Sequence, residues 1–249
     1  MWEISDMKKS VCVVTGGSRG IGRAICEMLL DVGHEVVFID IDDKKSVQFI
    51  NERNSDDLHY FHCDISQPKQ ITDCCDRILE QFGTVSILVN NAGIQTHVPF
   101  LEMSPECWMQ TMDINLNSAF YFCKAFAPGM VNQHWGRIIN IASMSARRGS
   151  NKHVHYCASK AGLVGMTRAL SMEIARYGVT VNAICPGIVD TDIVQETLSF
   201  KRETWLSEMH VKRLGQPSDI ANAAKYLISD DAEWVSGQAL DINGGILTP

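Results

Sequence analysis

The sequence lacks the segments that mark membrane, secreted and nucleic-acid-binding proteins. No apolar run reaches the roughly 18 residues that a helix needs to span a bilayer. The first residues do not pair a basic segment with an apolar one, so we expect no signal peptide. The net charge is -7, which argues against a nucleic-acid partner and against binding to an anionic membrane surface.

The cysteines do not form a recognisable framework. There are nine, an odd number, and their spacing is irregular, with Cys74 and Cys75 adjacent. Most others lie within apolar runs, so we expect buried, reduced thiols and a cytoplasmic protein. No spacing of cysteine and histidine resembles a zinc site, and we expect no metal.

Strand and helix patterns alternate along the whole chain. With 249 residues, 45% of them hydrophobic, and no repeat or clear linker, the chain is expected to form one domain over 1–249. Short apolar runs predict strands at 11–14, 36–39, 58–63, 86–89, 137–141, 180–184 and 239–242. Helical patterns lie between them, near 20–32, through the forties, up to 82–83, at 104–133 and at 156–176. This order predicts the α/β class, as a doubly wound parallel sheet (Rossmann fold) with helices on both faces.

The least regular stretch, about 190–213, follows a predicted strand end. Loops and segments at the carboxyl ends of parallel strands often cover a binding site. We therefore expect 190–213 to act as a substrate lid.

A glycine-rich turn joins the first predicted strand to the first helix. Its spacing is Gly-x-x-x-Gly-x-Gly, which differs from the common dinucleotide fingerprint. Glycines allow backbone amides to approach a diphosphate, and the helix N-terminus adds partial positive charge. The residues expected to hold a dinucleotide here are Gly16, Ser18, Arg19, Gly20, Ile21 and Gly22.

Asp40 ends the second predicted strand, where an acidic side chain accepts hydrogen bonds from the adenosine ribose. Its charge repels a 2′-phosphate, and Asp42 and Asp43 add to that repulsion. Arg19 argues the other way, because a basic residue in the turn can pair with a 2′-phosphate. We judge the ribose contact the stronger effect and predict NAD as the cofactor, with NADP disfavoured.

Tyr156 and Lys160 are four residues apart, so they share one face of a helix. A phenol has a pKa of about 10, and a neighbouring ammonium group is expected to lower it. The pair is therefore a candidate proton donor and acceptor near neutral pH.

Four features occur in order: the glycine turn, Asn90-Asn91-Ala92-Gly93, Ser143 and Tyr156-x-x-x-Lys160. Together they make the chain resemble the classical short-chain dehydrogenases/reductases over essentially its full length. The resemblance implies one doubly wound domain with a seven-stranded sheet, usually in a homotetramer. It also implies a secondary alcohol oxidised, or a ketone reduced, by hydride transfer.

The resemblance assigns roles to individual positions. Ser143 would hydrogen-bond the substrate oxygen, Tyr156 would be the general acid/base, Lys160 would bind the nicotinamide ribose, and Asn115 would support a water relay to the lysine. Further cofactor contacts implied by the resemblance are Asp64, Ile65, Asn91, Ala92, Gly93, Pro186, Gly187, Val189 and Thr191.

The segment 146–155 precedes the tyrosine and must pass near the reacting carbon. It carries Arg147, Arg148 and Lys152 but no acid, and the lid region adds further basic residues, partly offset by glutamates. We hypothesise an electropositive mouth that favours an anionic substrate. The alternatives are a solvated loop or charges that pair with another subunit. Tentative substrate contacts are Gln95, His97, Ser143, Arg148, His153 and Tyr156.

The helices at 104–133 and 155–176 are rich in aromatic and apolar residues, including Phe120, Tyr121, Phe122 and Phe126. One face must pack on the sheet. The other is a candidate subunit interface in a homotetramer or homodimer, although all of these residues can equally belong to the core.

Three functions compete. The first is an NAD-dependent dehydrogenase of a polyol, sugar, sugar acid or small hydroxy acid. The second is a 3-oxoacyl-acyl-carrier-protein reductase, which Asp40 disfavours because that reaction normally uses NADPH. The third is a catalytically silent nucleotide-binding regulator, against which the intact Ser143, Tyr156 and Lys160 argue.

Overall fold

Seven parallel strands form one sheet in the order β3-β2-β1-β4-β5-β6-β7. The structure is a computed structural model that describes residues 9–248, apart from the side chains of 193 and 195–200. The strands are β1 (Val11–Thr15), β2 (Glu35–Asp40), β3 (Leu58–His62), β4 (Val85–Asn90), β5 (Gly136–Ile141), β6 (Val179–Pro186) and β7 (Ala239–Ile242). The predicted doubly wound parallel sheet is confirmed.

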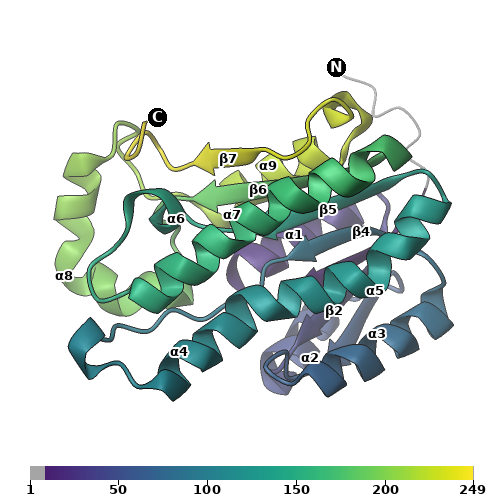
Figure 1. The fold of residues 1–249 in the computed structure, drawn as a ribbon, viewed down its shortest axis with the longest axis horizontal. Helices are drawn as coiled ribbons and strands as arrows, with labels where there is room; N and C mark the ends of the chain where they lie inside the picture. Colours follow the sequence, from purple (N-terminus) through teal and green to yellow (C-terminus); the bar gives the residue numbers. More distant parts are fainter. Residues whose placement is uncertain (1–8, 249) are drawn as a thin grey trace.

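Helices cover both faces of the sheet (Figure 1). They are α1 (Gly20–Asp31), α2 (Asp43–Arg53), α3 (Pro68–Phe82), α4 (Pro105–Met112), α5 (Ser118–Asn132), α6 (Ser145–Arg148), α7 (Val154–Ile174), α8 (Asp192–Glu208) and α9 (Pro217–Ile228). Short 3-10 turns occupy Phe100–Glu102, Ala175–Tyr177 and Asp230–Ala232.

Two apolar cores lie between the sheet and these helices. On one face α1, α2 and α9 pack on the strands through residues such as Leu29, Phe49 and Ile220. On the other face α3, α5 and α7 pack through residues such as Ile78 and Phe126. Because both faces are covered, the strands are apolar along nearly their whole length, which is why their sequences do not alternate.

The segment from α4 to α5 is not the single regular helix that the sequence predicts. Residues Asp113–Asn117 form a π-helical turn between α4 and α5. The aromatic residues are also divided: Phe122 and Phe126 are buried in the core, whereas Phe120 is 49% exposed. A π turn inserts an extra residue into a helix and is frequent at functional sites.

The predicted irregular stretch 190–213 is mainly helical, because α8 occupies most of it. Its last residues and the following loop pack through Met209 and Leu214 against Met144 and Ile188. Figure 1 places α8 beyond the arrowheads of β6 and β7, at the carboxyl edge of the sheet.

No helix in the described part of the chain combines the length and the apolar character required to cross a bilayer. All nine cysteines are free thiols, and most are buried. Within residues 9–248 there is no cluster of three or more His, Cys, Asp or Glu side chains arranged to hold a metal ion.

Candidate active site

A cavity of about 310 Å³ lies at the carboxyl ends of the neighbouring strands β1 and β4, where the strand order changes direction. It brings together most of the predicted cofactor residues and part of the predicted catalytic set. Its lining includes Gly16, Arg19, Gly20, Ile21, Asp40, Asp64, Ile65, Asn91, Ala92, Gly93, Gln95, Ser143, Tyr156, Lys160, Pro186, Gly187, Val189 and Thr191. Ser18, Gly22, His97, Asn115, Arg148 and His153 do not line it.

The glycine turn is held against the end of β4 by side chains. Thr15 Oγ1 accepts hydrogen bonds from the backbone N–H groups of Asn91 and Ala92, both at 3.0 Å. In return, Asn91 Nδ2 donates to the carbonyl oxygens of Thr15 at 2.9 Å and Gly16 at 3.1 Å. At Gly22, an added Cβ would lie 2.0 Å from the Gly16 carbonyl oxygen. Glycine is therefore required there for α1 to start this close to the turn and point its N-terminus at the cavity.

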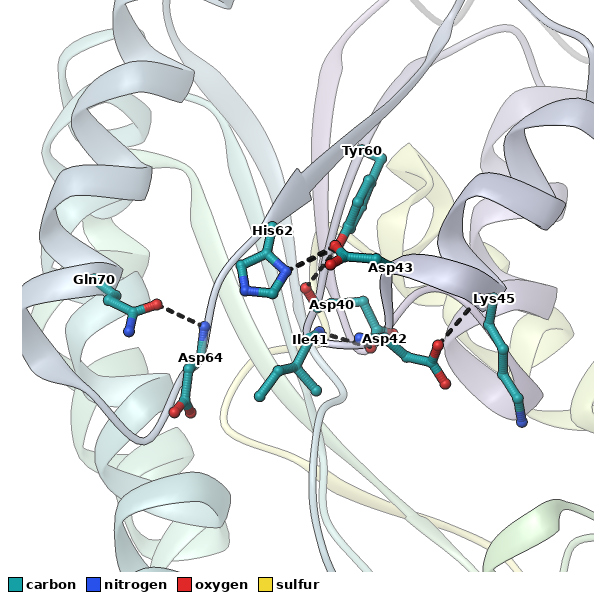
Figure 2. Close-up of polar contacts among 9 residues, drawn as sticks. All are labelled: Asp40, Ile41, Asp42, Asp43, Lys45, Tyr60, His62, Asp64 and Gln70. Atoms are coloured by element: carbon teal, nitrogen blue, oxygen red, sulfur yellow. Dashed lines mark hydrogen bonds and ion pairs between the residues drawn. The ribbon is translucent and has the colours of Figure 1, made fainter.

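Asp40 sits at the other end of the cavity, held by backbone donors (Figure 2). Its Oδ2 accepts a hydrogen bond from the Ser18 N–H at 3.0 Å, and its Oδ1 accepts from Ile41 at 2.8 Å and Asp42 at 3.1 Å. These bonds fix a carboxylate at the edge of a cavity that also contains Asp64. This arrangement fits the adenosine ribose of a dinucleotide, whose hydroxyls donate to carboxylates.

The two aspartates after Asp40 have different partners. Asp42 caps α2, its Oδ1 accepting from the Lys45 N–H at 3.0 Å. Asp43 Oδ1 lies 2.6 Å from the Tyr60 hydroxyl and 2.8 Å from His62 Nδ1, as Figure 2 shows. These two hydrogen bonds lower the pKa of the Asp43 carboxyl. Asp43 is thus turned toward β3, and of the aspartates at 40, 42 and 43 Asp40 alone lines the cavity.

Ser143, Tyr156 and Lys160 line the same cavity near the carboxyl end of β5. Ser143 follows β5, and the other two lie on the first turns of α7. Burial raises the pKa of the Tyr156 phenol, and a hydrogen bond with Ser143 opposes that rise. Burial also lowers the pKa of Lys160 to about 8.

The expectation that Lys160 lowers the pKa of Tyr156 is not met in this structure. Lys160 Nζ donates to the Ile141 carbonyl oxygen at 2.8 Å and lies 5.9 Å from the centre of the tyrosine ring. Its charge is therefore directed at the end of β5, and desolvation dominates the pKa of the phenol. Ser143 is the neighbour that lowers the pKa of the phenol.

Asn115 lies in the π turn and connects three segments of the site. Its Oδ1 accepts from the Ile94 N–H at 2.8 Å, and its Nδ2 donates to the Ile94 carbonyl at 2.9 Å and to Ser159 Oγ at 3.2 Å. The Ser159 hydroxyl in turn donates to the Tyr156 carbonyl at 2.8 Å. A Cβ added at Gly93 would meet Asn115 Oδ1 at 3.2 Å and Lys160 Nζ at 3.3 Å, so these two polar groups flank one glycine.

A histidine-containing wall adjoins the tyrosine. His153 stacks edge-on with His97 at 4.2 Å between ring centres and lies 6.1 Å from the Tyr156 ring. Its Nδ1 is 3.0 Å from Ser150 Oγ, and its Nε2 is 3.2 Å from Gln95 Nε2. An amide nitrogen can only donate, so this pairing requires an unprotonated Nε2. Burial, followed by His97, lowers the pKa of His153, which agrees with a neutral ring.

The arginines before the tyrosine are paired, contrary to the expectation of an electropositive mouth. Arg147 Nη1 lies 3.3 Å from Asp241 Oδ2, and its Nη2 donates to the Ala239 carbonyl at 2.7 Å. Arg148 lies 4.0 Å from Glu208 on α8. Because carboxylates distant in the sequence compensate both charges, the formal charge of 146–155 overstates its attraction for an anion.

The chain is similar to known oxidoreductases over nearly its whole length. The model of a family described as enoyl-(acyl carrier protein) reductase matches residues 16–247. The 3-oxoacyl-acyl-carrier-protein reductase FabG of Vibrio cholerae is 36% identical over 241 residues, which are 97% of this chain and 98% of that protein. The acetoacetyl-CoA reductase of Rhizobium meliloti is 38% identical over 237 residues, covering 94% of this chain and 97% of that protein.

Solved structures agree with this. The crystal structure of a "putative gluconate dehydrogenase" from Agrobacterium tumefaciens superposes with a TM-score of 0.94 at 32% identity, covering 98% of both chains. Fold, family match and relatives coincide on one conclusion: the chain belongs to the short-chain dehydrogenase/reductase family and is a nicotinamide-dependent oxidoreductase acting on CH–OH donors.

Proposed function

We propose that this protein is an NAD-linked reductase of 3-oxoacyl groups and dehydrogenase of the corresponding 3-hydroxyacyl groups. The observation that carries the reaction type is the placement of Ser143, Tyr156 and Lys160 at one end of a cavity that has Asp40 at the other. The relatives support the substrate class, since the names of both reductases above specify 3-oxoacyl thioesters. The relatives thus favour a 3-oxoacyl reductase, the second of the three functions considered from the sequence, over the dehydrogenase considered first.

The residues of the chain supply positioning and proton transfer. Tyr156 exchanges a proton with the substrate oxygen, and Ser143 hydrogen-bonds that oxygen. Lys160, one helical turn after Tyr156, binds the nicotinamide ribose, and Asn115 fixes the turn of α7 that carries the tyrosine. When bound, the nicotinamide accepts or gives the hydride.

NAD is proposed over NADP because Asp40 is fixed by three backbone N–H groups at the adenosine end of the cavity. A carboxylate held there accepts from ribose hydroxyls and repels a 2′-phosphate. This preference distinguishes the proposal from a reductase that depends on NADPH.

A second candidate is oxidation of a small hydroxy acid or sugar acid. The polar side chains of Gln95, which lines the cavity, and His153, whose ring lies 6.1 Å from that of Tyr156, favour it, because they suit a substrate with several oxygens. The fold neighbour described as a "putative gluconate dehydrogenase" is consistent with such a substrate.

A kinetic panel separates the two candidates. Acetoacetyl-CoA reduction and 3-hydroxybutyryl-CoA oxidation are compared with oxidation of free 3-hydroxybutyrate and gluconate, each with both cofactors. The proposal expects the highest kcat/KM for the thioesters with NADH or NAD. Turnover of gluconate or free 3-hydroxybutyrate at higher kcat/KM than the thioesters would favour the second candidate. Tyr156→Phe is the control that must abolish turnover of every true substrate while nucleotide binding persists.

We also propose a homotetramer or homodimer in the cytoplasm. Phe120 on α5, Met109 on α4 and Met172 on α7 are exposed apolar side chains of the kind that a subunit interface covers. The free thiols suit a reducing compartment. Sedimentation velocity of the purified protein tests the assembly, and a monomer would contradict it.

A further inference from the structure

Asp192, the first residue of the proposed lid helix α8, binds two cations of the nucleotide-binding half. Its Oδ2 lies 3.1 Å from Arg19 Nη1 and 2.7 Å from Lys45 Nζ. Arg19 directly precedes α1, and Lys45 lies in the first turn of α2. One carboxylate oxygen thus joins three elements that are far apart in the sequence.

These three side chains lie at the adenosine end of the cavity. Arg19 and Asp192 line the cavity together with Asp40. Ser18, immediately before Arg19, donates its backbone N–H to Asp40 Oδ2, and Asp42, two residues after Asp40, accepts from the Lys45 N–H. Figure 2 shows Lys45 on the Asp42 side of Asp40, away from Tyr60 and His62. Arg19 therefore lines the cavity near Asp40, and Lys45, which does not line it, is joined to the same corner through Asp192.

The charge balance of this corner depends on Asp192. Arg19 and Lys45 contribute two positive charges, and Asp40 and Asp42 contribute two negative ones. Asp192 makes the sum negative, and without it the sum is zero. Lys45 and Arg19 hold the pKa of Asp192 below its ordinary value, so it is ionised at neutral pH. A corner with an added fixed carboxylate repels a dianionic phosphate, and two cations already paired with that carboxylate are less available to it.

We propose that Asp192 is a specificity-determining residue that disfavours 2′-phosphorylated nucleotides by occupying Arg19 and Lys45. The inference rests on the proposed preference for NAD and extends it: Asp40 repels the phosphate, and Asp192 removes the two cations that would otherwise attract it. The selectivity of the cofactor site is thereby set in part by the lid helix.

Nucleotide fragments test this without any substrate. Isothermal titration calorimetry measures the Kd of 5′-AMP and of adenosine 2′,5′-bisphosphate for the full chain and for Asp192→Asn. In Asp192→Asn the bisphosphate is expected to gain about tenfold in affinity relative to 5′-AMP, and the gain should shrink as salt is added. Adding Lys45→Ala to Asp192→Asn should remove most of that gain.

Asp57→Asn is the matched control. Asp57 also forms an ion pair, with Lys9 at 2.6 Å. It lies just before β3, at the amino ends of the strands, whereas the cavity lies at their carboxyl ends. Asp57→Asn should leave the ratio of the two affinities unchanged.

The outcomes separate this inference from the proposal on which it rests. If the wild-type protein binds the bisphosphate more tightly than 5′-AMP, the preference for NAD itself is wrong. If the wild type prefers 5′-AMP and Asp192→Asn changes both affinities equally, or neither, Asp192 only anchors α8 and the inference is overturned. A gain of similar size in Asp57→Asn would also overturn it, because the effect would then be one of net charge.

Discussion

Replacing Lys160 by methionine should make the protein more stable at neutral pH while abolishing its activity. Lys160 is buried, with 4% of its surface exposed, and burial lowers its pKa from 10.5 to about 8. At about 1.4 kcal/mol for each pH unit, the charged lysine destabilises the folded state by about 3 kcal/mol below pH 8. The hydrogen bond from Nζ to the Ile141 carbonyl returns about 1 kcal/mol. Lys160→Met, which has similar length and no charge, should therefore gain about 2 kcal/mol at pH 7.

The lowered pKa of Lys160 also determines how the stability advantage of Lys160→Met changes with pH. Below pH 8 the lysine is protonated in both states, and the folded state bears the full penalty. Between pH 8 and 10.5 the folded protein loses the proton first, so the unfolded chain binds more protons and the wild type becomes more stable as pH rises. The advantage of Lys160→Met should consequently fall to near zero by about pH 9.5.

Urea unfolding followed by fluorescence at pH 7 and pH 9.5 measures the difference. Lys225→Met makes the same change at an exposed position of α9 and should alter the free energy of unfolding by less than about 0.5 kcal/mol. A Lys160→Met variant that is less stable than the wild type at pH 7, or whose advantage is the same at both pH values, would refute the reasoning.

Three further substitutions test other parts of the site. Gly22→Ala should lower the free energy of unfolding by about 3 kcal/mol and weaken nucleotide binding, because its Cβ would meet the Gly16 carbonyl. The control is Gly165→Ala, whose Cβ would have nothing within 4 Å and which should be neutral or stabilising in the same urea titration. Asn115→Leu should cost about 2–3 kcal/mol and most of kcat, since it breaks three hydrogen bonds of a buried side chain. Unchanged kcat would contradict the positioning role. Asp40→Ser should raise the ratio of kcat/KM for NADP to that for NAD by at least about tenfold, and a constant ratio would show that Asp40 does not select the cofactor.

The sheet could be predicted from the sequence because its strands are covered on both faces. Burial on both sides makes β4 and β5 continuous apolar runs, which are visible without any partner. Helix α9 was not predicted, although Pro217 at its start and buried residues at 220, 221, 224, 227 and 228 carry the helical spacing.

Features that depend on distant partners could not be predicted. Arg147 looks like a free cation in the sequence, but it pairs with Asp241 on β7. The lowered pKa of Lys160 can be predicted only when its side chain is known to be buried. Asn115, in the π turn, bonds to Ile94 and Ser159, which are distant in the sequence. The hydrophobic periodicity of 113–117 alone does not reveal these partners.

The π turn also determines how the protein would respond to the deletion of one residue. Helix interiors are ordinarily intolerant of deletions, but Asp113–Asn117 holds one residue more than regular winding requires. Deleting one residue of this turn would restore an uninterrupted α-helix. The helices on either side would keep nearly their relative orientation, because the wide turn had accommodated the extra residue. Phe122 would stay in the core, but the widened turn from which Asn115 binds Ile94 would be lost. The site therefore depends on a count of residues as well as on their identity, and the shorter, more regular helix would belong to an inactive protein.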